Sequence, residues 1–192
     1  MKNKFLIILI LLLFLIFILF LYFNKNLKYN KKRFVENNFN NKNIQQNMKI
    51  SSPNFTNLGY IPTKFTCDGE NINPTLIFEN IPENTKSLVL IVDDPDAPTG
   101  RWIHWLLWNI DPNIKEIESG KTPPKSTSGK NDFGNLNYGG PCPPSGTHRY
   151  YFKLYALDNI LNLKEGSNVK ELEKLIAGHI IEKAELIGLY KR

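Results

Sequence analysis

Two short, proline-stiffened segments of the sequence hold side chains that could exchange protons or bind an anion. The first contains Asp94 and Asp96, with His104 following it, and the second leads into His148. Imidazole and carboxylate groups within hydrogen-bond distance suit general acid–base chemistry, and protonated imidazole also binds anions. From spacing alone, a purely structural role for both segments is an equal alternative.

Strand ends are predicted to position both segments. Residues 87–92 form a continuous branched apolar run, which is typical of a strand buried on both faces. The prolines within residues 93–98 must end that strand, because proline fixes φ and lacks a backbone donor. Residues 102–108 return to the core, and residues 139–146 form the second turn. Each turn therefore holds polar side chains at the end of a buried strand.

Further strands and one late helix complete the prediction. Strands are expected at residues 49–52, 64–66, 74–78, 102–110 and 150–158, a helix at 171–177 and a long loop at 119–137. Gly178 is the predicted helix stop. Strands at this density with one helix favour an antiparallel two-sheet β-sandwich over a βαβ fold.

Several ordered motifs between about residues 49 and 190 resemble those of the phosphatidylethanolamine-binding protein family. The shared motifs are the turn at residues 94–98, Trp102 with His104, and residues 140–150. Bacterial and archaeal members typically also show the segments found here at residues 66–71 with Pro74, 131–134 and 185–190. The resemblance implies a mainly β fold, an antiparallel two-sheet β-sandwich with small peripheral α-helices.

The resemblance also implies a pocket for anionic groups such as the phosphate of a phospholipid head group. Carried over to this sequence, the ligand-binding residues are Asp94, Asp96, Pro98, His104, Gly140, Pro143, Pro144, His148 and Tyr150. Imidazoles near carboxylates hold a proton more readily, and a Gly-Pro turn can present backbone N–H groups to an oxyanion. The alternatives are a core His104 bonded to Asp94 and a solvent-facing His148. His179 is predicted to be structural.

Non-enzymatic binding of phospholipid head groups or other phosphorylated anions is therefore the expected function, with regulation of a protein partner as an extension. Inhibition of a protease or kinase is the alternative hypothesis. A hydrolase that uses His148 as base and Asp94 to orient it is a third. No serine nucleophile elbow, metal-ligand spacing or phosphate loop supports an enzyme, so neither a cofactor nor a metal is expected. Many eukaryotic members have two adjacent histidines where this chain has Ile103 and His104, so their signalling roles are not carried over.

Positive charge is concentrated before residue 48. The formal net charge is +6, and residues 1–47 contain eight Lys and Arg against one Glu, whereas residues 48–192 are almost neutral. A nucleic-acid-binding domain carries its positive charge on the folded surface, so the sequence argues against that class.

An apolar run at residues 5–23 predicts a transmembrane anchor after a short tail at residues 1–4. At helical rise this run spans roughly 28 Å, about the thickness of a bilayer core. Because no small residue occurs between Phe5 and Asn47, we expect an uncleaved single-pass anchor, with a cleaved signal peptide as the alternative. The basic residues after the run favour a cytoplasmic domain, and the opposite orientation is the alternative.

Residues 24–47, rich in Asn and Lys, are predicted to be a disordered linker before the domain at residues 48–192. Cys67 and Cys142 lie in motif loops, and neither has the spacing of a zinc site. A disulfide between them would require an oxidising compartment, which conflicts with a cytoplasmic domain. Their pairing therefore stays open.

Overall fold

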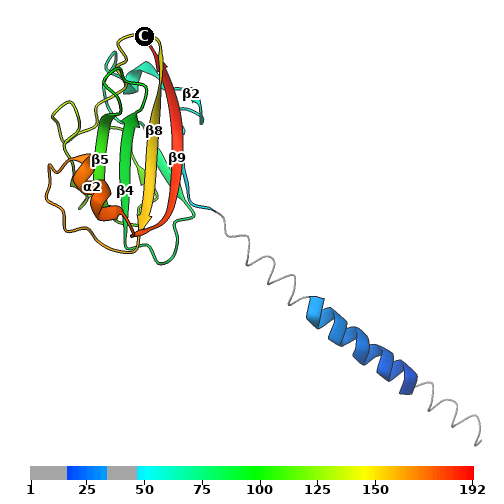
Figure 1. Cartoon of the computed structure of the whole chain (residues 1–192). Helices are drawn as coiled ribbons and strands as arrows, with labels where there is room; N and C mark the ends of the chain where they lie inside the picture. Colours follow the sequence, from blue (N-terminus) through cyan, green and yellow to red (C-terminus); the bar gives the residue numbers. More distant parts are fainter. Residues whose placement is uncertain (1–16, 34–46) are drawn as a thin grey trace, which may run out of the picture. The chain divides into compact units, whose positions relative to one another are not determined.

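The computed structural model describes residues 17–33 and 47–192. The chain divides into two compact units, Met1–Gln46 and Asn47–Arg192 (Figure 1). Residues 17–33 form a helix in the first unit, and the strands of the described residues all lie in the second.

The predicted transmembrane anchor is wrong. In the parts of the chain that the structure describes, no helix is both long enough and apolar enough to cross a membrane. The physical reason is that the helix at residues 17–33 is apolar or aromatic only through Phe23, after which Asn and basic residues predominate. The expected single-pass membrane location with a cytoplasmic domain is corrected with it. Residues 1–16, which include most of the predicted anchor, lie outside the described residues.

Part of the predicted disordered linker is also described. Residues 24–33 are helical, contrary to that prediction, and residues 34–46 lie outside the described residues. Residues 24–33 contain neither Pro nor Gly, the residues that disfavour a helix most strongly.

Residues 47–192 form two sheets, of six and three strands, with an apolar core between them. The larger sheet has the order β2-β9-β8-β4-β5-β7 and the smaller the order β1-β3-β6. The strands are β1 (Lys49–Ser51), β2 (Gly59–Tyr60), β3 (Leu76–Glu79), β4 (Ser87–Asp94), β5 (Trp102–Ile110), β6 (Glu116–Ile117), β7 (Thr127–Ser128), β8 (Thr147–Leu157) and β9 (Ile180–Lys191). Pairing is antiparallel except between β2 and β9. The predicted mainly β architecture is confirmed.

Strand β4 lies at the centre of the larger sheet and is buried along its whole length. Leu88, Leu90 and Val92 contribute to the core between the sheets. Val89 and Ile91 point to the other face and join a second apolar cluster. The continuous apolar run thus reflects a strand that meets water on neither side.

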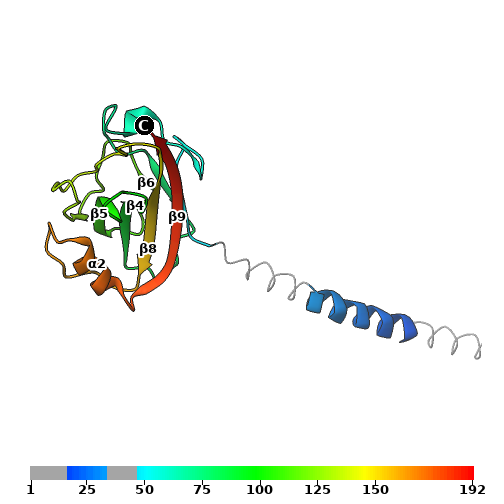
Figure 2. The ribbon, with the colours of Figure 1, turned by 45° about the horizontal axis from the view of Figure 1, so that its top comes forward.

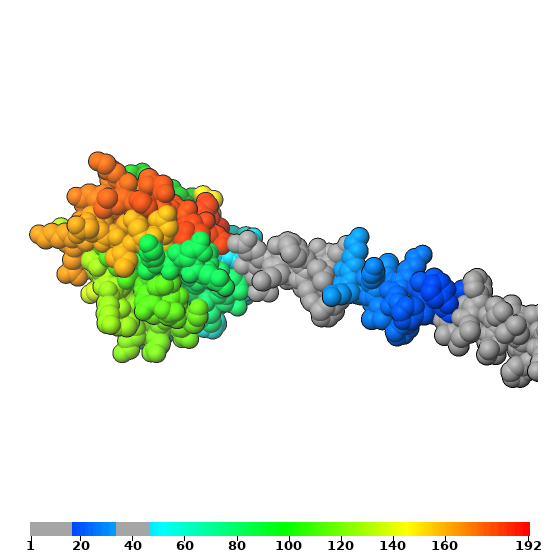
Figure 3. Space-filling model, turned by 90° about the horizontal axis from the view of Figure 1, so that it is seen from below, coloured from blue at the N-terminus to red at the C-terminus, as the bar shows by residue number. Residues whose placement is uncertain are grey.

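Helix α2 (Val169–Ile176) covers that second face of the larger sheet, in front of β4 and β5 in Figure 1 and beside them in Figure 2. Its buried Leu172 and Ile176 belong to the second cluster. The Asn168 side chain accepts hydrogen bonds from the first helical turn, and Glu171 completes a capping box. Figure 3, a view from below, shows the orange residues around α2 next to the green residues of the sheet.

Two local predictions differ from the structure. Residues 64–66 were predicted as a strand, but Thr63–Phe65 form a 3₁₀ helix, η1. Pro62 precedes it with φ of −58°, and the backbone N–H of Thr66 donates back to the carbonyl of Thr63, so a tight turn replaces extended pairing. The long strand β9 was absent from the prediction.

Candidate functional site

Antiparallel pairing brings the polar ends of three strands together. The end of β4 pairs with the beginning of β5, where Asp94 is opposite Trp102, and with the beginning of β8, where Asp93 is opposite Tyr151. Residues that are far apart in the sequence, Asp94, His104 and His148, therefore meet at one end of the larger sheet.

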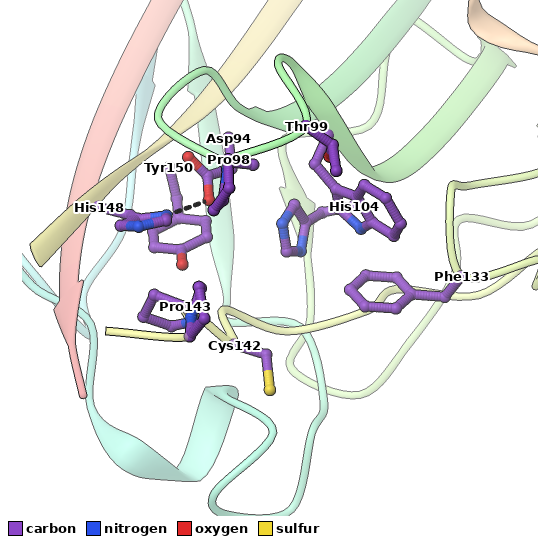
Figure 4. Close-up of a pocket in the computed structure, with 12 residues that line it drawn as sticks. Asp94, Pro98, Thr99, His104, Phe133, Cys142, Pro143, His148 and Tyr150 are labelled. Carbon is purple, nitrogen blue, oxygen red and sulfur yellow. Dashed lines mark hydrogen bonds and ion pairs between the residues drawn. The ribbon is translucent and has the colours of Figure 1, made fainter. Parts of the chain in front are cut away.

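A cavity of about 210 Å³ lies at this end of the sheet (Figure 4). It is lined by Asp94, Ala97, Pro98, Thr99, Trp102, His104, Phe133, Cys142, Pro143, Pro144, His148 and Tyr150. Seven of the nine residues predicted for the pocket line this cavity, and Asp96 and Gly140 do not.

Asp94 holds the imidazole of His148 in place. Its Oδ2 lies 2.7 Å from Nδ1 of His148, and its Oδ1 accepts a hydrogen bond of 2.8 Å from the backbone N–H of Asp96. Both side chains are buried. With Nδ1–H committed to the carboxylate, Nε2 is the ring nitrogen left for a ligand, and it donates when the imidazole is protonated. The solvent-facing alternative for His148 is therefore wrong.

His104 is bound to a backbone carbonyl, and the predicted alternative of a bond to Asp94 is not what the structure shows. Its Nδ1 lies 2.6 Å from the carbonyl oxygen of Gly139. A carbonyl only accepts, so Nδ1 carries the hydrogen and Nε2 carries the lone pair of the neutral ring. Burial lowers the pKa of His104, against smaller opposing effects from the Gly139 carbonyl and Asp94. The ring is therefore a neutral hydrogen-bond acceptor at neutral pH.

Tyr150 supplies a hydroxyl that makes no hydrogen bond of good geometry among the described residues, although the backbone of Cys142 and the carboxylate of Asp94 lie close enough to interact with it. The residue is 1% exposed, and its ring meets that of His104 edge-on with centroids 5.2 Å apart. Burial, with the charge of Asp94, raises the pKa of Tyr150, while the backbone of Cys142 has a smaller opposite effect. The hydroxyl points toward Pro143 in Figure 4 and remains a protonated donor.

An aromatic wall forms the other side of the cavity. The rings of Trp102 and Phe133 meet edge-on at 5.5 Å, and Phe133 meets His104 in the same way at 5.3 Å. The cavity is therefore polar at the end of Asp94 and His148 and apolar at the end of the aromatic wall.

Asp96 is engaged outside the cavity by Arg149. Its carboxylate accepts from the backbone N–H, Nε and Nη2 of Arg149 at 3.0, 2.9 and 2.7 Å. Chiefly because of the side-chain hydrogen bond with Arg149, the pKa of Asp96 is lowered from 3.8 to about 2. This forked contact fixes the β4–β5 turn on β8, so Asp96 shapes the pocket from outside.

Gly140 is also structural in this arrangement. Its backbone N–H donates to Oδ1 of Asn71 at 2.7 Å and is not free for an oxyanion. A Cβ at this position would lie 2.6 Å from both that oxygen and the carbonyl oxygen of Phe65. Glycine therefore permits the close approach of two loops.

The opposite face of β4 carries a separate ionic cluster. Asp93 is fully buried and accepts from Lys153 at 2.7 Å and from Arg101. Arg101 also donates to Glu173 of α2 at 2.6 Å. Because neighbouring residues of a strand point to opposite faces, Asp93 anchors α2 while Asp94 faces the cavity.

Cys67 and Cys142 form a disulfide, with Cα atoms 5.4 Å apart. The bond joins the loop after η1 to the cavity wall, and it settles the pairing that the sequence left open. His179 lies outside the cavity and pairs with Asp158 at 2.8 Å. Within residues 17–33 and 47–192, no group of three or more His, Cys, Asp or Glu is placed to hold a metal ion.

Five lining residues were absent from the predicted site, namely Ala97, Thr99, Trp102, Phe133 and Cys142. Trp102, Phe133 and Cys142 all lie in motif segments, and Ala97 and Thr99 flank Pro98. Membership of these segments was the available signal, but only the folded chain shows which of their side chains face the cavity.

Comparison with known proteins agrees with this architecture. The family model described as phosphatidylethanolamine-binding protein matches residues 51–191. The chain belongs to the phosphatidylethanolamine-binding protein family. The sequence resemblance is confirmed, and its emphasis on bacterial and archaeal members agrees with the relatives found.

Two archaeal relatives are similar over most of the domain. The UPF0098 protein of Pyrococcus horikoshii is 50% identical over 157 residues, which cover 77% of this chain and 78% of the relative. The UPF0098 protein of Methanothermobacter thermautotrophicus is 47% identical over 150 residues, or 76% of this chain and 99% of the relative.

Two solved structures share the fold. A putative phosphatidylethanolamine-binding protein homologue from Chlamydia trachomatis, CT736, superposes with a TM-score of 0.74 at 41% identity and covers 76% of this chain and 98% of its own. YbcL of E. coli, described as a member of the mammalian family, gives a TM-score of 0.71 at 29% identity with the same coverage.

Proposed function

We propose that the pocket binds a phosphorylated small molecule or phospholipid head group through its phosphate, without chemical turnover. The observation that carries this proposal is the buried hydroxyl of Tyr150, which makes no hydrogen bond of good geometry among the described residues. An unsatisfied buried hydroxyl costs roughly 1–3 kcal/mol. A phosphate oxygen in the cavity would supply the missing acceptor.

The polar groups of the pocket match a phosphate that keeps one proton. Tyr150 and a protonated His148 donate, while the neutral His104 accepts at Nε2. A phosphate monoester with one P–OH group offers both acceptor oxygens and one donor, whereas the diester phosphate of an intact phospholipid offers acceptor oxygens alone. When His148 is protonated, its imidazolium balances the carboxylate of Asp94, and the anion then enters a site without net negative charge.

The aromatic wall suits the rest of such a ligand. Trp102 and Phe133 present apolar ring surface, which also attracts an alkylammonium group. The family name refers to phosphatidylethanolamine, and its phosphorylethanolamine head group combines a phosphate with an ammonium. A cavity of about 210 Å³ has room for a head group of this size, with any acyl chains outside it.

Binding without turnover is favoured by the lack of an activated side-chain nucleophile among the lining residues. The sulfur of Cys142 is held in a disulfide. Thr99 is the lining residue with an aliphatic hydroxyl, and no described hydrogen bond joins it to His148. The hydrolase hypothesis is therefore tested together with binding, by measuring release of inorganic phosphate.

Titration calorimetry with O-phosphorylethanolamine between pH 5.5 and 8 tests the proposal. His148→Ala and His104→Ala should each weaken binding about tenfold to a hundredfold, the equivalent of roughly 1.5–3 kcal/mol for a hydrogen bond to a charged group. His179→Ala is the matched control and should bind as the wild type does.

Affinity should also fall as pH rises through the range in which imidazole loses its proton, which is about 6.5 for the unperturbed group. Binding is expected to take up protons, because the anion favours imidazolium. Equal affinity throughout the range, or undiminished binding by His148→Ala, would place the anion elsewhere. Steady release of phosphate that His148→Ala abolishes would establish the hydrolase instead.

A further inference from the structure

We propose that the Cys67–Cys142 disulfide is a thiol–disulfide exchange site for low-molecular-weight thiols, and that its reduction weakens phosphate binding in the adjoining pocket. The first half stands on the geometry of the disulfide. The second half rests on the proposed function.

The disulfide links the protein surface to the wall of the pocket. Cys67 is exposed, whereas Cys142 is half-buried and lines the cavity next to Pro143. Figure 4 shows Cys142 at the edge of the cavity, with its sulfur directed away from the aromatic wall. A small thiol can therefore reach one cysteine from solvent, and the other transmits the change to the site.

A fixed positive charge lies beside one of the two sulfurs. Nη1 of Arg192 lies 3.5 Å from Sγ of Cys142, and Nη2 pairs with Asp68 at 3.0 Å. The backbone of Arg192 exchanges two hydrogen bonds with Gly146, which hold it in place. A neighbouring guanidinium favours thiolate over thiol, and a better-stabilised thiolate leaves faster in exchange.

These positions fix the direction of exchange. The thiolate of a small thiol attacks Sγ of Cys67, a new S–S bond forms to that sulfur, and the Cys67–Cys142 bond breaks. Cys142 leaves with the electron pair as a thiolate beside Arg192. A second thiolate then attacks the mixed disulfide on Cys67 and releases the small-molecule disulfide, so the protein gains two electrons and two small thiols are oxidised.

The reduced loops stay together but lose their covalent link. The backbone N–H of Cys67 still donates to the carbonyl of Pro141 at 3.1 Å, and Gly140 is still bound to Asn71. These contacts keep the two thiols adjacent after reduction, which makes the change reversible. Reduction loosens the cavity wall at Pro143, and a less ordered pocket binds its ligand more weakly.

The exchange is tested on the full, oxidised chain with glutathione under anaerobic conditions. Samples are quenched with acid, alkylated and analysed by mass spectrometry. The mixed disulfide should form on Cys67, with Cys142 as the alkylated thiol. Arg192→Gln should slow the exchange about threefold. Lys191→Gln is the matched control, because Lys191 is exposed and its side chain makes no ion pair among the described residues. Absence of exchange, glutathione mainly on Cys142, or equal rates for all three proteins would overturn the exchange site.

The effect on the pocket is tested by calorimetry with O-phosphorylethanolamine before and after reduction with dithiothreitol. The reduced wild type should bind about tenfold more weakly. The Cys67→Ala/Cys142→Ala variant should give one affinity with or without reductant. Equal affinity of the oxidised and reduced wild type overturns the link to the pocket. If even the oxidised protein fails to bind, the proposed function and this link both fail, while the glutathione experiment still decides the exchange site.

Discussion

Replacing Tyr150 with phenylalanine should have opposite effects on stability and on ligand binding. The hydroxyl is buried and makes no hydrogen bond of good geometry among the described residues, so the ligand-free protein carries its desolvation cost. Phenylalanine keeps the ring that packs against His104 and removes only the polar atom. We therefore expect Tyr150→Phe to raise the free energy of unfolding and to weaken phosphate binding.

The Tyr150 hydroxyl oxygen determines the size of both the stability change and the affinity change. Removing an unsatisfied buried hydroxyl should stabilise the protein by roughly 1–3 kcal/mol. For a domain of this size, each 1 kcal/mol raises the melting temperature by about 2–4 °C. In the complex the hydroxyl donates to a charged phosphate, and losing that bond costs roughly 1.5–3 kcal/mol, or about tenfold to a hundredfold in affinity.

Tyr138→Phe is the matched control. The Tyr138 hydroxyl donates to the backbone carbonyl of Phe65 at 3.1 Å, and Tyr138 does not line the cavity beside His148. The same substitution there removes a satisfied hydrogen bond, so it should lower stability by about 1 kcal/mol and leave phosphate affinity unchanged.

Both variants are measured by thermal and urea unfolding without ligand and by calorimetry with O-phosphorylethanolamine. A less stable Tyr150→Phe protein would mean that the hydroxyl is already satisfied in the free protein, and the argument for a vacant acceptor position would fail. Higher stability with undiminished affinity would show that the phosphate does not reach Tyr150.

Three further predictions concern the folded structure that supports the site. Gly140→Ala should lower the free energy of unfolding by roughly 1–3 kcal/mol, because the new Cβ would lie 2.6 Å from Oδ1 of Asn71, and urea unfolding measures this. Residues 47–192 should fold alone, with a native near-ultraviolet circular dichroism spectrum, since the related Chlamydia chain is matched over 98% of its length by this part of the protein; an unstructured product would contradict this. The folded-state pKa of Asp96 is depressed, so its contact with Arg149 stabilises the protein above pH 3.8 and loses that effect as pH falls toward about 2. The melting temperatures of wild type and Asp96→Asn should therefore differ at pH 7 and converge in acid, and a constant difference would exclude this linkage.

The parts of the fold that local physics dictates could be predicted from the sequence. The run at residues 87–92 indicated a strand buried on both faces, and β4 has an apolar cluster on each side. Pro95 and Pro98 marked the turn after it. The late helix was also predicted, although the capping box at Asn168 starts α2 earlier than expected. In contrast, the apolar run before residue 24 predicted a membrane anchor, and the described helix is not apolar over enough of its length.

The site itself was predictable as a set of motif residues but not as a set of contacts. Asp96 and Gly140 belong to the motifs, yet neither lines the cavity. The carboxylate of Asp96 is bound to Arg149, and the backbone N–H of Gly140 is bound to Asn71. The partner of each polar group depends on the distances between loops, and these distances cannot be read from the spacing of residues in the sequence.

The sequence by itself determined the buried strand at residues 87–92, the turn after it and the late helix, because burial, proline geometry and helix propensity act between near neighbours in the chain. Only the tertiary structure decided that Asp94 binds His148 and not His104, and that Cys67 meets Cys142. Those choices depend on the register of β4 against β5 and β8 and on the packing of loops from distant parts of the chain. They leave the Tyr150 hydroxyl, among the described residues that line the pocket, buried and without a hydrogen bond of good geometry.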